Sequence, residues 1–183
     1  NLEKHVENVE LFGYKPVIAL NRFPSDAPEE IALVRAFAEE RGLPFAPSEV
    51  YAQGGEGGLE LAERVLEALD LPHAYRPLYP LEASLEAKVE AIATRVYGAE
   101  GVEWSEEAKR ALKAAKKEGC EALPVVVAKA ATSLSDNPRL RGRPRGFTVR
   151  VTDLRCRLGA GFVVVYMGGR ETLPGLPKTP QAF

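Results

Sequence analysis

Residues 48–58 combine an aromatic side chain with four glycines, in the order SEVYAQGGEGG. Glycine lets the backbone approach a ligand closely and adopt positive φ. An amphipathic helix is predicted directly after Gly58, and the N–H groups at its start favour a phosphate or carboxylate. Tyr51 adds a flat face on which a heterocycle can stack. The stretch is compatible with a ligand loop or with a plain strand-to-helix turn.

A second segment favours the ligand loop. Residues 15–20 read KPVIAL, an apolar and partly β-branched run typical of a buried strand. They lead directly into the polar and aromatic residues NRFPSD at 21–26. A strand that ends in such a cluster, followed by a helix, is the usual layout of a ligand site at the carboxyl edge of an α/β sheet.

The elements around these segments alternate between strand and helix. The pattern predicts a leading helix over Leu2–Phe12, a strand over Pro16–Leu20 and a second strand over Phe45–Val50. The helix between the strands is expected to begin at a capping box of Asp26 and Glu29, and to end at Gly42. The helix after Gly58 carries an apolar stripe made by Leu59, Ala62, Leu66 and Leu69. A parallel βαβα unit is therefore expected.

The pattern changes after a proline-rich linker at 71–80. Two helices are predicted, one from about Ser84 to Tyr97 and one from Ser105 to Gly119. Three strand-like runs follow, at Pro124–Ala128, Phe147–Val151 and Phe162–Met167. Helices first and strands afterwards indicate a small α+β subdomain. The expected organisation is an α/β ligand-site unit at 1–75 and an α+β subdomain at 76–183.

Composition narrows the class of protein. The 183 residues are 45% hydrophobic with a net charge of −2, and no apolar run approaches the ~18 residues of a membrane helix. No leader sequence is recognisable, so we expect no targeting segment. Cys120 and Cys156 form no C-x-x-C pair, and we expect both to be reduced and intracellular. His5 and His73 lack metal-ligand spacing, and no metal site is predicted.

Four segments in the same order carry a resemblance to a known family: VIALNRFPSD, SEVYAQGGEGG, GRPRGFTVRV and LPGLPKTP. With them the chain resembles the C-terminal third of formate–tetrahydrofolate ligases. The family's phosphate loop, Gly-x-x-x-x-Gly-Lys-Ser/Thr, is absent from this chain. The resemblance implies a fragment that lies at the edge of a larger nucleotide-binding sheet in its parent. The isolated fragment is expected to be inactive.

The resemblance also implies the chemistry of the parent. It would be a cytoplasmic homotetramer that joins formate to tetrahydrofolate, with ATP and Mg²⁺, by way of formyl phosphate. Its partners would be these small molecules, and no membrane or nucleic-acid partner is expected. This fragment would supply a stacking slot for the pterin or the base.

Phe23 and Tyr51 would form the aromatic walls of that slot, where the family has a tryptophan in place of Tyr51. The implied folate- or nucleotide-binding residues are Asn21, Arg22, Phe23, Tyr51, Gly54, Gly55, Glu56, Gly57 and Gly58. No catalytic residue and no metal ligand is assigned in this part. Each role has a structural alternative: core filling for the two rings, a helix cap for Glu56 and a turn for Asn21.

Two other functions compete with the ligase assignment. Seven arginines fall within residues 139–157, which suits a polyanion or nucleic-acid surface. Only Phe147 is available there for base stacking, so a structural loop partly at a subunit contact is preferred. The third possibility is an oligomerisation or structural domain, in which the proline-rich tail Pro174–Lys178 packs as a strap.

Overall fold

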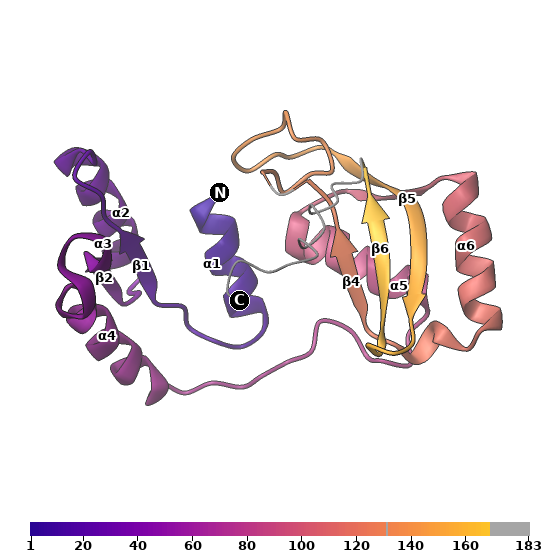
Figure 1. The fold of residues 1–183 in the computed structure, drawn as a ribbon, viewed down its shortest axis with the longest axis horizontal. Coiled ribbons are helices and arrows are strands. Elements are labelled where there is room, and N and C mark those ends of the chain that lie inside the picture. The colour runs from indigo at the N-terminus through magenta and orange to yellow at the C-terminus, as the bar shows by residue number, and fades with distance from the viewer. Residues whose placement is uncertain (131, 169–183) are drawn as a thin grey trace, which may run out of the picture. The chain divides into compact units, whose positions relative to one another are not determined.

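The computed structural model describes residues 1–130 and 132–168, which form two compact units (Figure 1). The first unit comprises Leu2–Pro77, and the second begins at Leu78. Each unit has its own hydrophobic core. The strap predicted at Pro174–Lys178 and the LPGLPKTP motif lie outside the described residues.

The first unit is built around two parallel strands. Its elements are α1 (Leu2–Leu11), β1 (Ile18–Asn21), α2 (Pro28–Glu40), β2 (Phe45–Ser48), α3 (Val50–Gln53), the 3-10 turn η1 (Gly54–Gly58) and α4 (Leu59–Leu69). Ile18 lies opposite Phe45 and Asn21 opposite Ser48. The predicted parallel pairing is thus confirmed, with α2 as the crossover between the strands.

The start of α2 differs from the prediction. Ala27, not Asp26, is the N-cap residue, and its N–H donates to the Glu30 carboxylate at 3.4 Å. Asp26 instead accepts a hydrogen bond from the Phe23 N–H at 2.8 Å, so it closes a turn before the helix. Pro28 takes the first helical position, where its missing N–H costs nothing. The predicted end is confirmed, since Gly42 has φ +59°.

The core of the first unit is small. Its buried members are Val6, Ile18, Ala38, Leu43 and Phe45. The apolar stripe of α4 does not join them, because its three leucines are 56–67% exposed. The helix therefore forms as predicted, while its apolar stripe stays uncovered within the described residues.

The second unit is a four-stranded mixed sheet with helices. Its elements are α5 (Leu85–Ala91), the π-helical turn η2 (Ile92–Tyr97), β3 (Gly101–Trp104), α6 (Glu106–Lys117), η3 (Cys120–Ala122), β4 (Val125–Ala128), β5 (Thr148–Arg157) and β6 (Phe162–Met167). The strand order is β3-β5-β6-β4. β3 is parallel to β5, and β4 is parallel to β6. β5 and β6 are antiparallel (Figure 1).

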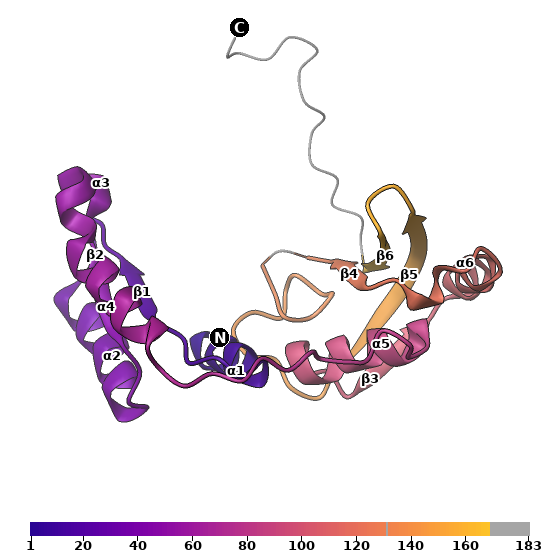
Figure 2. The ribbon, with the colours of Figure 1, turned by 90° about the horizontal axis from the view of Figure 1, so that it is seen from below.

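One face of this sheet makes the larger core. Every second residue of β6 is fully buried, at Val163, Val165 and Met167. α5 and α6 pack against the sheet (Figure 2). Both helices begin at serine caps as predicted: Ser84 accepts from a backbone N–H at 3.2 Å and Ser105 from another at 3.0 Å.

β3 is a strand that the sequence did not predict. Gly98 has φ +78° and ends the preceding helix, as expected. Gly101 opens β3 and pairs with Thr148 of β5. A glycine at the first position of an edge strand costs the sheet little, because no neighbour on the open side needs its side chain.

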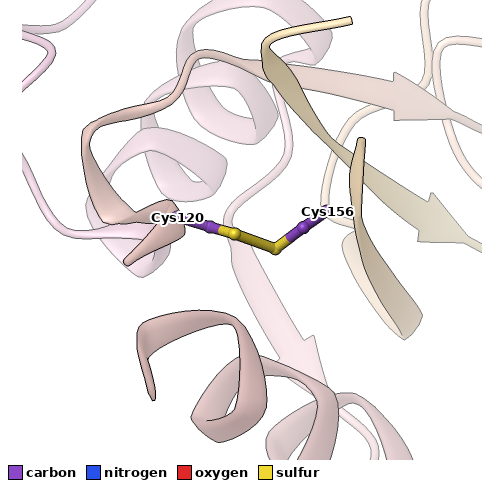
Figure 3. The surroundings of a disulfide bond; sticks show 2 residues. All are labelled: Cys120 and Cys156. Atoms are coloured by element: carbon purple, nitrogen blue, oxygen red, sulfur yellow. A yellow bond between two sulfur atoms is a disulfide. The ribbon is translucent and has the colours of Figure 1, made fainter. Parts of the chain in front are cut away.

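Cys120 and Cys156 are joined by a disulfide bond (Figure 3). The prediction that both are reduced is therefore wrong. Their Cα atoms lie 6.5 Å apart although 36 positions separate them in sequence. Cys120 follows α6 and is fully buried, and Cys156 lies on β5 beside it. The bond thus links η3 to the sheet across the core.

Removal of this cross-link should destabilise the second unit. Closing a loop of this length is worth about 4 kcal/mol in the unfolded chain. We expect the free energy of unfolding of the second unit to fall by roughly that amount when dithiothreitol is added. The fluorescence of Trp104, the chain's one tryptophan, reports on this unit. The first unit contains no cysteine and serves as an internal control. Two free thiols in the folded protein, titrated without reductant, would contradict the cross-link.

Lys88 is fully buried in the second unit. Its ammonium donates hydrogen bonds to the backbone carbonyls of Glu121 and Leu123, and lies 6.0 Å from the centre of the Tyr79 ring. Tyr79 in turn accepts from the Val125 N–H at 3.0 Å. Burial lowers the pKa of Lys88, against the opposing effect of nearby carboxylates. The lysine therefore anchors the turn that holds the disulfide.

Lys88→Met should cost about 2 kcal/mol of unfolding free energy, because it leaves two carbonyls without their donor. It should also change the pH dependence. The folded pKa of Lys88 lies below 10.5, so the unfolded chain binds this proton more tightly. Stability should rise as pH increases from the folded pKa to 10.5 in the parent chain, and rise less in the variant. Lys116→Met, at an exposed ion pair with Glu86, is the control. Equal effects of the two variants would contradict the anchoring role.

Candidate functional site

The loops that follow β1 and β2 leave the sheet at the same edge. The parallel pairing ends with Asn21 opposite Ser48, and the Arg22 N–H donates to the Ser48 carbonyl at 2.9 Å. The residues that follow, 22–26 and 49–58, are therefore neighbours although a whole helix separates them in sequence. The carboxyl ends of parallel strands are the usual place for a ligand in α/β folds.

Phe23 and Tyr51 meet at this edge. Their ring centres are 5.5 Å apart and their planes are inclined by 53°. Phe23 is 42% exposed and Tyr51 73% exposed, so neither ring fills the core of the first unit. Adjacent aromatic rings that remain accessible are typical of surfaces that bind a ligand.

The ring pair is closed in this structure. A flat heterocycle between two rings needs about 7 Å between them, twice the contact distance of carbon atoms. Phe23 and Tyr51 would have to part, which gives up a ring contact worth about 0.5–1.5 kcal/mol and gains two with the ligand. Side chains this exposed change rotamer within nanoseconds or less. The pair can therefore open without rearrangement of the strands.

The glycine run forms a turn that closes on its own start. Gly54–Gly58 is a 3-10 turn, and the Gly57 carbonyl accepts from the Glu49 N–H at 2.9 Å. The first N–H of α4, on Leu59, donates to the Glu56 carbonyl. One of the N–H groups at the start of α4 is therefore already hydrogen-bonded within the glycine run. Gly54 alone among the four glycines has positive φ, at +60°.

Gly57 has a structural reason to be glycine. Its φ is not positive. A Cβ atom built on it would lie 2.5 Å from both the carbonyl carbon and the carbonyl oxygen of Glu49. Gly57 is thus required by a close approach of backbone to backbone. Gly55, in contrast, has open space around it.

Gly57→Ala should destabilise the first unit, whereas Gly55→Ala should not. The new methyl at 57 collides with backbone atoms that cannot move aside, and such overpacking costs about 1–3 kcal/mol. The methyl at 55 meets nothing. Hydrogen exchange at the Glu49 amide, which the turn protects, measures the difference directly. Equal exchange rates in the two variants would show that the close approach is absent in solution.

A polar frame of Arg22, Glu49 and Gln53 links the two loops that carry the rings, and Glu49 and Gln53 were not predicted as site residues. The Glu49 carboxylate accepts from the Arg22 guanidinium on one oxygen and from the Gln53 amide on the other. The only sequence signal was the spacing of Glu49 and Gln53, four residues apart, which places both on one side of a helical turn. Asn21 and Glu56, both named as candidates, are exposed.

A cavity of 180 Å³ lies elsewhere in the first unit, at the far end of α4. Its lining residues are Tyr14, Lys15, Ala68, Leu69, Leu71, Pro72 and His73. Sites for small organic ligands usually enclose about 300–1,000 Å³. The cavity is too small for a folate or a nucleotide, and the exposed ring pair remains the better candidate.

Hydrogen bonds to backbone groups hold the arginine-rich segment of the second unit, residues 139–157, in place. The Asp136 carboxylate accepts from the Arg150 N–H at 3.0 Å, and the Ser133 hydroxyl donates to the Leu140 carbonyl. Lys129, which precedes this segment, is partly buried. It donates to the carbonyls of three residues of the loop, and burial lowers its pKa.

The described residues offer one group of possible metal ligands, in which atoms of Glu118, Cys120 and Cys156 lie within 4.8 Å of one another. Both sulfurs are engaged in the disulfide and present no thiolate. Within the described part of the chain, no helix combines the length and apolar character needed to cross a membrane.

The first unit thus has the layout of an α/β ligand-binding protein, with polar and aromatic loops at the carboxyl ends of parallel strands. A sequence profile for formate–tetrahydrofolate ligase matches residues 1–183. The chain therefore belongs to the formate–tetrahydrofolate ligase family, as its motifs predicted.

Two relatives show how much of the family's length the chain represents. It is 43% identical over 183 residues to the formate–tetrahydrofolate ligases of Staphylococcus aureus strains JH9 and Newman. Each alignment covers 100% of this chain and 33% of the relative. The chain thus spans about a third of the length of the relatives that it matches.

Proposed function

We propose that this chain is part of an enzyme that joins formate to tetrahydrofolate with ATP, and that it supplies the stacking slot for the pterin or the adenine. The family match supports the reaction class. The observation that carries the slot is the exposed contact between Phe23 and Tyr51 at the carboxyl ends of β1 and β2.

The residues around the rings would complete the slot. Asn21 and the Arg22 guanidinium lie beside Phe23, and Glu56 lies with Gly54 and Gly55 on the turn after α3. Exposed amide, guanidinium and carboxylate groups can orient the polar edge of a pterin or a purine. Gly57 and Gly58 contribute by letting the turn close against Glu49 and Val50 rather than by touching the ligand.

The overall reaction divides into two steps. A formate oxygen attacks the γ-phosphorus of ATP, the bond to ADP breaks, and formyl phosphate results. The N10 amine of tetrahydrofolate then attacks the formyl carbon, loses its proton and expels phosphate. The first step requires groups that hold phosphates and Mg²⁺. The chain has no sequence of the form Gly-x-x-x-x-Gly-Lys-Ser/Thr that would form a phosphate loop. We therefore assign this chain to ring binding and not to phosphoryl transfer, and expect it to be inactive alone.

The wider setting of the chain is also part of the proposal. We place it in a cytoplasmic homo-oligomer whose partners are formate, tetrahydrofolate and ATP. The uncovered leucine stripe of α4 is consistent with burial against other parts of such an assembly. A nucleic-acid role for residues 139–157 is not favoured, because the matched family is named for small-molecule substrates, formate and tetrahydrofolate.

Tyr51→Ala in a full-length ligase carrying this region should raise the KM for tetrahydrofolate or for ATP by roughly 5- to 150-fold. The reason is the loss of one stacking partner, which is worth ~1–3 kcal/mol. Tyr51→Trp should keep the KM or lower it. Tyr75→Ala, at a tyrosine that is also exposed but lies beyond α4, is the matched control. Steady-state kinetics with each substrate varied in turn measures the effect. If Tyr51→Ala lowers only the melting temperature, Tyr51 is not part of a slot.

A further inference from the structure

Glu49 contacts both loops that carry the aromatic rings. It lies between the end of β2 and the start of α3, and its side chain is 28% exposed. One carboxylate oxygen accepts from Arg22, the residue before Phe23. The other accepts from Gln53, two residues after Tyr51. The Glu49 carboxylate is therefore hydrogen-bonded to one donor close in sequence to each ring.

The backbone of Glu49 is fixed as well. Its N–H donates to the Gly57 carbonyl at 2.9 Å, and its carbonyl accepts from the N–H groups of Ala52 and Gln53 at 3.0 and 2.9 Å. The Gly57 backbone approaches so closely that a Cβ there would collide with Glu49. Because these hydrogen bonds fix the Glu49 backbone, its carboxylate can keep the Arg22 and Gln53 donors in a defined geometry.

The contact between the rings cannot itself hold the two loops when a ligand enters, because the ligand replaces it. Another link is needed that persists while Phe23 and Tyr51 are apart. Within the described residues, the Arg22–Glu49–Gln53 link joins the same two loops without using either ring. If the loops are already fixed, less conformational entropy is lost when the ligand binds.

We propose that Glu49 is a positioning residue that keeps the loops of Phe23 and Tyr51 at the separation a planar ring requires. The proposal rests on the ring-binding function proposed above. Glu49 does not touch the ligand in this scheme and takes no part in the chemistry. Its effect should fall on substrate binding, and therefore on KM rather than kcat.

The first experiment measures ring geometry in the 183-residue chain. We expect nuclear Overhauser contacts between the ring protons of Phe23 and Tyr51, given their 5.5 Å centre-to-centre distance. Glu49→Ala should weaken these contacts at least twofold. Glu60→Gln, which removes an equal charge from the exposed first turn of α4, should leave them unchanged. Unchanged contacts in Glu49→Ala would overturn the proposal.

The second experiment uses a full-length ligase that carries this region, with tetrahydrofolate as the varied substrate. An exposed charge-assisted link is worth up to about 1 kcal/mol, so we expect Glu49→Ala to raise KM by up to about fivefold at unchanged kcat. Gln53→Met removes one donor without disturbing the strands, and should raise KM about twofold. It keeps the test decisive if Glu49→Ala fails to fold. Glu60→Gln should leave KM unchanged.

The outcomes separate this proposal from the one on which it rests. If Tyr51→Ala raises KM while Glu49→Ala and Gln53→Met do not, the slot exists and Glu49 does not position it. If none of the three raises KM for tetrahydrofolate or ATP, the slot itself is wrong. If Glu49→Ala lowers kcat with KM unchanged, Glu49 acts in the chemical steps, and the positioning role is overturned.

Discussion

The parallel pairing of β1 and β2 is the constraint on which the candidate site depends. Ile18 and Phe45 are paired and buried, and they fix which face of each strand meets the core. A slip of one residue would turn every side chain to the opposite face. Asn21 would then no longer lie opposite Ser48, and the two loops that carry the rings would lose their common edge. The arrangement of the site is thus a consequence of two short buried strands and the helix that crosses between them.

Features that depend on local sequence were predictable. Ser84 and Ser105 have the hydroxyl that caps a helix, and both do so. Gly42 and Gly119 end helices with positive φ, as expected from their position after periodic apolar residues. The expectation that Phe23 and Tyr51 would share a sheet edge needed only two strand patterns and the parallel default. The helix caps and ends require knowledge of one element and its flanks, and the shared edge requires only two neighbouring strands.

Features that depend on contacts between residues far apart in sequence were not predictable. The disulfide joins positions 36 residues apart with no motif between them, and the buried Lys88 finds its carbonyl partners more than 30 residues away. Gly57 was assigned to a ligand because a glycine pattern does not say what comes close to it. In the structure the neighbour is the Glu49 backbone. The carboxylate link made by Glu49 was missed for the same reason, since Arg22 lies on another strand end.

In the first unit, the groups that stabilise the fold differ from the groups that set the geometry of the ring site. Its core has only a handful of buried side chains, and Leu59, Leu66 and Leu69 of α4 remain exposed. The links that define the ring site are short and polar, and they lie within residues 21–57. Such links set geometry but add little stability, because exposed ion pairs contribute about 1 kcal/mol or less. Geometry at the rings is therefore specified locally, while the stability that holds this geometry must come largely from apolar burial. The uncovered face of α4 is where additional burial would contribute most.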